Sequence, residues 1–225
     1  MVNVGSTLIA LKYKDGVMIG TDTQCSYGSM SEVKNFQKMD YLCSEGIYAC
    51  SGEMSDFQNL QKHLDEKFEY DEIQNDGACF MHIRDYHNYV AGRSYNARTK
   101  SPCLVTTVMG GIDKRNGEVF LGYSNSHGLK IEQNWIATGF GNHFCTVLLD
   151  NEWRADLSAD ECKALIEKCL TVMFWRDKLG HDQIQIGNVT KEGSTIGQMY
   201  KLKTDKNLRF FHEMTNDHFR PLTIR

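Results

Sequence analysis

The sequence predicts an α+β fold with four layers (αββα), in which two antiparallel sheets pack face to face and a helix pair covers each outer face. Three observations predict it. Segments alternate as strands, helix pair, strands, helix pair and strands. Turn signals join neighbouring strands, which favours antiparallel hairpins. Residues 17–19 form a continuous apolar run, as expected of a strand that is buried on both faces.

The first part of the chain supplies two strand pairs. Asp15-Gly16 is a hairpin-turn signal between the apolar residues 8–11 and 17–19. Glu45-Gly46 separates the predicted strands 39–43 and 47–50 in the same way. Both pairs are therefore expected to be antiparallel.

Two helices follow. Ser55 and Gln58 have the spacing of a capping box at the start of the first helix. Its apolar residues recur at helical spacing: Phe57, Leu60, Leu64 and Phe68. The second helix must end by Thr99, because residues that precede a proline, such as Ser101, disfavour helix. Its predicted inward face consists of Phe80, Ile83, Tyr86, His87 and Val90.

Strands return after Pro102. Residues 104–109 alternate, and Asn116-Gly117 is a strong hairpin signal before residues 119–123. Further strands are predicted at 129–131 and 135–137. Two more helices follow, and Ser158 with Glu161 forms a capping box at the start of the second. Its apolar stripe is Cys162, Leu165, Ile166, Cys169, Leu170, Met173 and Phe174. A last hairpin pairs residues 183–189 with 194–202 through Glu192-Gly193.

Length and composition indicate one domain, residues 1–202, followed by a C-terminal extension, residues 203–225. The 225 residues contain only two prolines and no Gly/Ser linker. The net charge of −4 gives no reason to expect nucleic acid as a partner. No apolar run approaches the roughly 18 residues of a membrane span, and no signal peptide is evident, so no membrane partner is expected.

Cysteine and histidine spacing predicts no metal site and no cofactor. The eight cysteines include no CxxC pair, which argues against zinc-ribbon and thioredoxin-like folds. We expect buried, reduced thiols in a reducing compartment. His82 and His87 are five residues apart, which is not the HxxxH spacing that zinc favours.

Gly5-Ser6-Thr7, Asp22 and Lys38 suggest a hydrolase that uses one residue twice. In that chemistry a hydroxyl attacks, and the free α-amine of the same residue, with a pKa of about 7.7–8, accepts the proton. Here five residues precede Ser6. Unless the Gly5–Ser6 bond is cut, the nitrogen of Ser6 is an amide and cannot act as a base. The simpler alternatives are an ordinary serine at a strand start and a structural Asp22–Lys38 ion pair.

Several motifs, taken in order, resemble the beta subunits of the 20S proteasome, which have the N-terminal-nucleophile hydrolase fold. The resemblance covers about residues 5 to 200. It rests on residues 16–22 (GVMIGTD), Ser51-Gly52, residues 138–141 (TGFG) and residues 175–177 (WRD). Among the beta types, the chain looks most like the non-catalytic beta-7 type, also named beta type 4. That likeness rests on residues 26–29 (SYGS), Ser51-Gly52 with residues 56–58 (DFQ), Gln185-Ile186 and Val189-Thr190.

The resemblance implies a partly retained active site. Ser6 matches the position of the catalytic threonine, and Asp22, Lys38 and Asp177 match the conserved acid, lysine and second acid. The lysine is expected to lower the proton affinity of the nucleophile.

Two positions depart from the pattern. Phe140 and Gly180 stand where active members carry serines. A phenyl ring can neither donate nor accept a hydrogen bond, and we expect it to desolvate the charge that the chemistry needs. We therefore expect no catalytic residue in this chain.

The resemblance also implies partners: the other alpha and beta subunits, in hetero-heptameric rings of a 28-subunit particle in cytoplasm and nucleus. On this interpretation the chain is a structural subunit of the proteolytic chamber, whose active sites lie on other beta subunits. A self-processed Ser6 endopeptidase and a free-standing homo-oligomeric hydrolase are the alternatives. The extension is expected to dock on neighbouring subunits through Arg209, Phe210, Phe211, Phe219 and Arg220, the other possibility being a disordered end.

Overall fold

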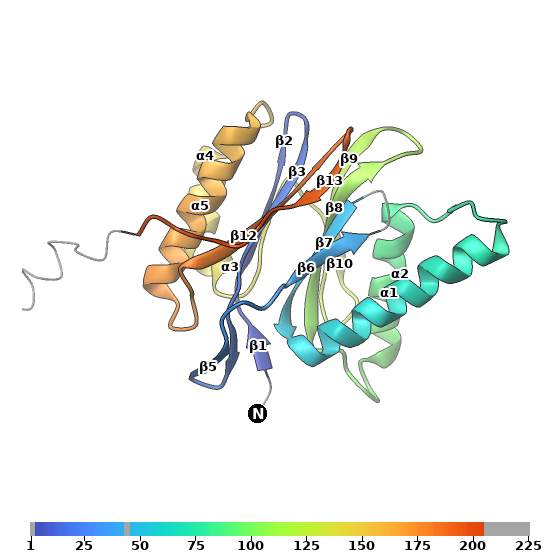
Figure 1. Cartoon of the computed structure of the whole chain (residues 1–225), viewed down its shortest axis with the longest axis horizontal. Coiled ribbons are helices and arrows are strands. Elements are labelled where there is room, and N and C mark those ends of the chain that lie inside the picture. The colour runs from blue at the N-terminus through green and yellow to red at the C-terminus, as the bar shows by residue number, and fades with distance from the viewer. Residues whose placement is uncertain (1–2, 43–45, 205–225) are drawn as a thin grey trace, which may run out of the picture.

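A computed structural model describes residues 3–42 and 46–204 of the chain. Two antiparallel sheets lie between two helical layers (Figure 1). The predicted four-layer α+β fold is confirmed. None of the helices in the described part of the chain has the length and apolar character that a membrane span requires.

The larger sheet has the strand order β10-β9-β8-β7-β1-β4-β5, and β6 also pairs with β7. Its strands are β1 (Asn3–Gly5), β4 (Cys25–Tyr27), β5 (Met30–Val33), β6 (Met39–Leu42), β7 (Gly46–Glu53), β8 (Val105–Asp113), β9 (Glu118–Ser124) and β10 (Lys130–Glu132). The smaller sheet has the order β11-β2-β3-β12-β13, and β14 also pairs with β12. Its strands are β2 (Leu8–Tyr13), β3 (Gly16–Asp22), β11 (Trp135–Ala137), β12 (Gln183–Thr190), β13 (Gly193–Ile196) and β14 (Tyr200–Lys201).

The helices separate by sheet. The larger sheet is covered by α1 (Met54–Gln74) and α2 (Ile83–Ala97). The smaller sheet is covered by α3 (Gly141–Phe144), α4 (Thr146–Glu152) and α5 (Ala159–Arg176). In Figure 1 these two sets lie on opposite sides of the strands.

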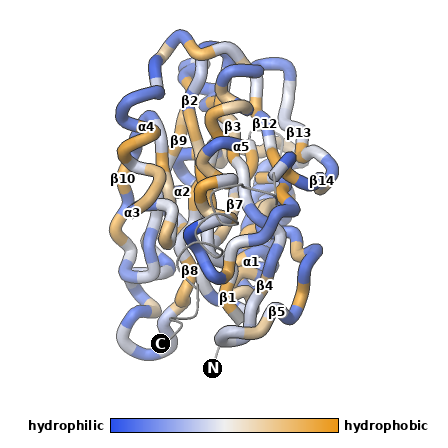
Figure 2. The backbone as a smooth tube through the Cα atoms, turned by 90° about the vertical axis from the view of Figure 1, so that its left-hand side faces the viewer, coloured by the Kyte–Doolittle hydropathy of each residue, from blue (hydrophilic) through white to orange (hydrophobic). Residues whose placement is uncertain are grey.

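The apolar run at residues 17–19 is buried on both faces of its sheet, as the sequence predicts. Val17 and Ile19 belong to the cluster between the two sheets, whereas Met18 belongs to the cluster under α5. Apolar colour follows β2, β3 and β9 in Figure 2. Because side chains alternate between faces, such a strand has no face left for polar residues.

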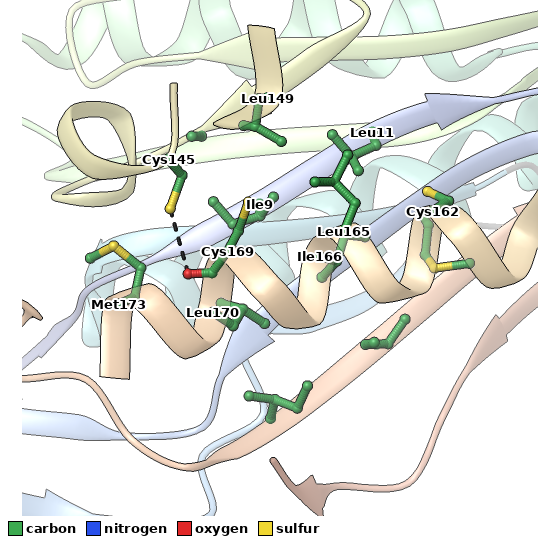
Figure 3. Close-up of a cluster of buried hydrophobic side chains, with 14 of the residues drawn as sticks. Ile9, Leu11, Cys145, Leu149, Cys162, Leu165, Ile166, Cys169, Leu170 and Met173 are labelled. Carbon is green, nitrogen blue, oxygen red and sulfur yellow. Dashed lines mark hydrogen bonds between the residues drawn. The ribbon is translucent and has the colours of Figure 1, made fainter. Parts of the chain in front are cut away.

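Helix α5 forms as the sequence predicts, with a capping box between Ser158 and Glu161. Six residues of its apolar stripe are buried, and Phe174 is only partly buried. Figure 3 shows this stripe packed against Ile9 and Leu11 of β2. The Cys145 thiol donates a 3.5 Å hydrogen bond to the carbonyl oxygen of Cys169, which joins the α3–α4 junction to α5.

Two predictions about the helices of the first layer are wrong in detail. Glu53, and not Ser55, caps α1, because its Oε1 accepts hydrogen bonds from the nitrogen and hydroxyl of Ser55 at 3.1 and 2.7 Å. Phe80 is not part of α2, which begins at Ile83, and its side chain is 66% exposed. The carboxylate of Asp71 accepts from the nitrogen of Phe80 at 2.7 Å and so keeps this segment in a loop.

The sequence pattern missed β1, β4 and β5. These strands are three or four residues long, and every residue of β5 is exposed, so none shows an apolar period. The predicted strand 194–202 is also interrupted. It is divided into β13 and β14, and between them the nitrogen of Gly197 donates to Ile186 at 2.8 Å.

Candidate functional site

Ser6 lies where the chain passes from the larger sheet to the smaller one. It follows β1 and precedes Thr7 and β2. Its side chain is 9% exposed, and Oγ has no hydrogen-bond partner among the described residues. The crossing places this hydroxyl at one end of the sandwich, close to the turn at Gly139, where an added Cβ would lie 2.5 Å from the carbonyl oxygen of Ser6.

Asp22 and Lys38 form a buried ion pair. The Nζ of Lys38 lies 2.8 Å from Oδ1 of Asp22, and the two side chains are 1% and 5% exposed. The second carboxylate oxygen accepts from the nitrogen of Gln24 at 3.3 Å. Asp22 is positioned as the last residue of β3, and Lys38 immediately precedes β6.

The stem of Lys38 lies against Gly5, directly before Ser6. A Cβ added at Gly5 would be 2.9 Å from Cε of Lys38 and 2.9 Å from Cε of Met54. Glycine at position 5 therefore allows the lysine to reach Asp22 beside the backbone of β1. The structure brings three predicted site residues, Ser6, Asp22 and Lys38, to one corner of the fold.

Asp177 caps the C-terminus of α5 and begins the loop that reaches this corner. Its Oδ1 accepts from the nitrogen of Leu179 at 2.9 Å, whereas the buried Oδ2 has no partner among the described residues. The nitrogen of Gly180 donates to the carbonyl oxygen of Asp177 at 2.9 Å. A Cβ at position 180 would approach the carbonyl oxygen of Met173 to 2.8 Å, so this turn excludes any side chain there without a shift.

Phe140 lies beside a cavity of about 420 Å³ that opens next to Ser6. The lining residues are Val4, Gly5, Ser6, Ser51, Gly52, Thr106, Gly139, Phe140, His143 and Leu179. The phenyl ring is 53% exposed. It therefore replaces a polar group in the wall, but it desolvates the corner less than the sequence suggested.

The backbone before Ser6 is held on both sides by the larger sheet. Val4 pairs with Glu53 of β7 and with Ser26 of β4, and Gly5 pairs with Gly52 of β7. The three-residue strand β1 thus lies between β4 and β7 as an ordinary ladder strand. Any extended peptide that approached Ser6 along these two strands would meet β1 in its place.

The corner as described contains a hydroxyl and an ion pair but no base that is hydrogen-bonded to the hydroxyl. The ammonium of Lys38 is paired with Asp22, and the nitrogen of Ser6 belongs to a peptide bond. His143 lines the same cavity. In residues 3–42 and 46–204 no group of three His, Cys, Asp or Glu side chains is arranged to hold a metal ion.

Sequence reasoning missed several polar residues around Ser6. The hydroxyls of Thr7 and Thr138 are buried without a partner in the described structure, and Ser51, Thr106 and His143 line the cavity. The one available signal was Gly139, whose φ of 58° allows the close approach to Ser6. The five docking residues predicted between Arg209 and Arg220 lie outside the described residues.

Comparisons with known proteins agree with this geometry. The family described as "Proteasome subunit" matches residues 2–189. The chain is 38% identical to "Proteasome subunit beta type-4" of Arabidopsis thaliana, over 94% of this chain and 85% of the relative. It is 32% identical to the Xenopus laevis protein of the same name, over 85% of this chain and 79% of the relative, and 29% identical to "Proteasome subunit beta 1" of Ignicoccus hospitalis, over 83% and 91%. The chain therefore belongs to the proteasome subunit family, as a beta subunit that assembles with other alpha and beta subunits in the core particle.

Proposed function

We propose that this chain is a non-catalytic, structural subunit of the beta ring, of the kind named beta type-4 in its relatives. It forms part of the wall of the chamber in which other beta subunits cleave ubiquitin-targeted proteins. The observation that carries the proposal is the strand β1, which is continuous with Ser6 and is paired with both β4 and β7. A nucleophile that needs its own free amine has none while β1 remains attached.

The surroundings of Ser6 support the same conclusion. Phe140 offers no hydrogen bond, and the turn at Gly180 has no room for a side chain. Catalytic groups that act as a unit lose nearly all their effect when one of them is missing. The retained ion pair of Asp22 and Lys38 is explained without catalysis, because breaking a buried pair from one side costs about 3–5 kcal/mol.

The proposal is tested on purified core particles that contain the chain. Intact-mass measurement is expected to find a chain that still includes residues 3–5 ahead of Ser6. An electrophile that links a hydroxyl to an adjacent amine is expected to label other beta subunits and to leave Ser6 unmodified. Particles that carry Ser6→Ala should keep all peptidase activities. Label on Ser6, or loss of one activity in the variant, would contradict the proposal.

A second candidate function is a self-processed peptidase with Ser6 as its nucleophile. It is favoured by one observation: the Oγ of Ser6 is unpartnered and borders a cavity of about 420 Å³ beside the buried lysine. Cleavage of the Gly5–Ser6 bond would supply the missing amine. The mass measurement separates the two functions, because this candidate requires a chain that begins at Ser6.

We further propose that residues 203–225 dock on neighbouring subunits and help to join two half-particles. The sequence from Arg209 to Arg220 combines aromatic anchors with basic residues, which is typical of interface hot spots. Deletion of residues 210–225 is expected to slow the joining of half-particles while the subunit still folds. An unchanged yield of complete particles would contradict this role. Localisation to cytoplasm and nucleus belongs to the same proposal, and imaging of the tagged chain tests it.

A further inference from the structure

The far half of α1 leaves the body of the protein. The buried residues of the helix all lie in its first eleven positions: Met54, Phe57, Leu60 and Leu64. From Asp65 to Gln74 no residue is buried. In Figure 1 this end of α1 and the segment after it extend away from the sheets. We call residues 65–80 the α1 tip.

Large apolar side chains are exposed on the α1 tip. Tyr70 is 56% exposed, Ile73 is 75% exposed and Phe80 is 66% exposed. Ile73 is the most exposed large hydrophobic residue in the described part of the chain. Tyr70 and Ile73 are three positions apart on a helix, so their side chains share one face. Exposed apolar groups that gather in this way are typical of an interaction surface.

The exposure of Phe80 is enforced by the structure around it. The carboxylate of Asp71 accepts from the nitrogens of Phe80 and Met81 at 2.7 and 2.9 Å. It also accepts from the side chain of Asn75 at 3.0 Å, so both ends of the loop are tied to α1. These backbone hydrogen bonds hold the pKa of the Asp71 carboxyl below its usual value. The loop is therefore ordered in a form that holds the phenyl ring in water.

The α1 tip is strongly acidic. Residues 65–76 contain six acidic residues (Asp65, Glu66, Glu69, Asp71, Glu72 and Asp76) and one basic residue, Lys67, for a net charge of −5. The whole chain has a net charge of −4, so this short segment carries more negative charge than the complete molecule. Glu66 and Glu69 lie four positions before Tyr70 and Ile73, and so they flank the apolar face.

We propose that the α1 tip inserts Tyr70, Ile73 and Phe80 into an apolar socket on another subunit of the core particle, and that lysine and arginine side chains rim this socket. Opposite charge on the rim sets register and excludes wrong partners, while the apolar anchors supply the affinity. A second copy of this chain would bring two segments of charge −5 together, which is repulsive. The same charge opposes binding to nucleic acid or to an anionic membrane. The proposal rests on membership of the core particle and is independent of whether Ser6 is active.

A photo-reactive phenylalanine analogue at position 80 of the tagged full chain tests the partner. In assembled particles it is expected to crosslink one other subunit, at a peptide that combines apolar residues with lysine or arginine. The same analogue at position 30 is the matched control, because Met30 is also 66% exposed but lies on β5. Position 30 should not yield that peptide. A crosslink from position 80 to a second copy, to an acidic peptide or to no subunit would overturn the proposal.

Incorporation into the particle tests the anchors and the rim separately. The triple variant Tyr70→Ser/Ile73→Ser/Phe80→Ser is expected to lower the fraction of tagged chain in complete particles about tenfold or more. Glu66→Lys/Glu69→Lys should lower it less and in a salt-dependent manner. Met30→Ser is the control and should leave it unchanged. Equal incorporation of the triple variant and the control would overturn the proposal, provided that circular dichroism shows both chains folded.

Discussion

Two regions of this molecule break the usual arrangement of apolar residues inside and charged residues outside, in opposite directions. Beside Ser6, an ammonium and a carboxylate are buried at 1% and 5% side-chain exposure. On the α1 tip, Ile73 and Phe80 are exposed at 75% and 66%. The first region has a partner within the chain, because Lys38 neutralises Asp22. The second has none in the described structure.

The difference shows where the cause of each exception lies. A buried ion pair is tolerated because its own fold supplies the opposite charge and the hydrogen bonds. An exposed apolar face gains nothing from the fold of its own chain, so its cause is sought outside the chain. The four predictions below run from the largest expected effect on stability to the smallest, and each tests one side of this contrast.

The largest effect is expected from Lys38→Ala. The change leaves the buried Asp22 carboxylate without its counter-ion, which is expected to lower the free energy of unfolding of the full chain by about 3–5 kcal/mol. Urea unfolding monitored by circular dichroism measures it. The double variant Asp22→Leu/Lys38→Met removes both charges and should recover most of the loss. A loss in Lys38→Ala below about 1 kcal/mol would show that water or another cation compensates the acid.

A second buried polar group, His87, should make stability depend on pH. Burial lowers the pKa of His87, although the 3.0 Å hydrogen bond from its ring nitrogen to the carbonyl oxygen of Tyr123 opposes this. The unfolded chain therefore binds a proton more readily than the folded chain. Stability should be complete above the unfolded pKa of about 6.5 and fall below it, by up to about 1.4 kcal/mol per pH unit, until the lowered folded pKa is reached.

The control for this prediction is His87→Gln, which keeps an N–H group but does not titrate. Unfolding midpoints at pH 7.5 and 5.5 are compared for both chains. The variant should lose less stability between these values than the original chain. Identical losses would show that other groups, and not His87, carry the pH dependence.

A smaller effect is expected from Asp71→Ala. Loss of its hydrogen bonds to Phe80 and Met81 should cost about 0.5–1 kcal/mol locally and speed amide exchange at both residues. Because the pKa of Asp71 is lowered in the folded chain, acid should mimic the variant. The loop contribution is present above the usual carboxyl pKa and is lost as pH falls through the lowered one. Unchanged exchange at Phe80 would mean that the loop is held by other contacts.

The smallest effect on folding is expected from Ile73→Ser. The side chain is 75% exposed, so unfolding of the isolated full chain should change by no more than about 0.5 kcal/mol. Phe57→Ala, in the buried half of the same helix, is the matched comparison and should cost about 3–5 kcal/mol. A large loss in Ile73→Ser would show that the α1 tip packs within this chain, which would remove the contrast.

The sequence predicted the regular parts of the fold and missed those that depend on contacts distant in sequence. The stripe of α5 and its Ser158–Glu161 cap are local signals, and both are present. The continuous run at Val17–Ile19 indicated correctly that both faces of β3 are covered. In contrast, β1 exists only because β4 and β7 lie on either side of it. Phe80 looked like a helix residue because its apolar spacing cannot reveal the distant carboxylate of Asp71.

The candidate site was predictable in its members but not in its state. Motif resemblance placed Ser6, Asp22 and Lys38 together, and the structure brings them to one corner. Neither spacing nor composition could show that the space before Ser6 is filled by a paired strand, or that a carbonyl oxygen occupies the position where a Gly180 side chain would begin. Those facts are set by backbone paths from distant parts of the chain.

The double pairing of β1 has a kinetic consequence for any cut at Gly5–Ser6. The released fragment would remain seated between two strands, held by the ladder that it already occupied. A freshly exposed amine would thus begin under product inhibition, and its first turnover would wait for the fragment to dissociate.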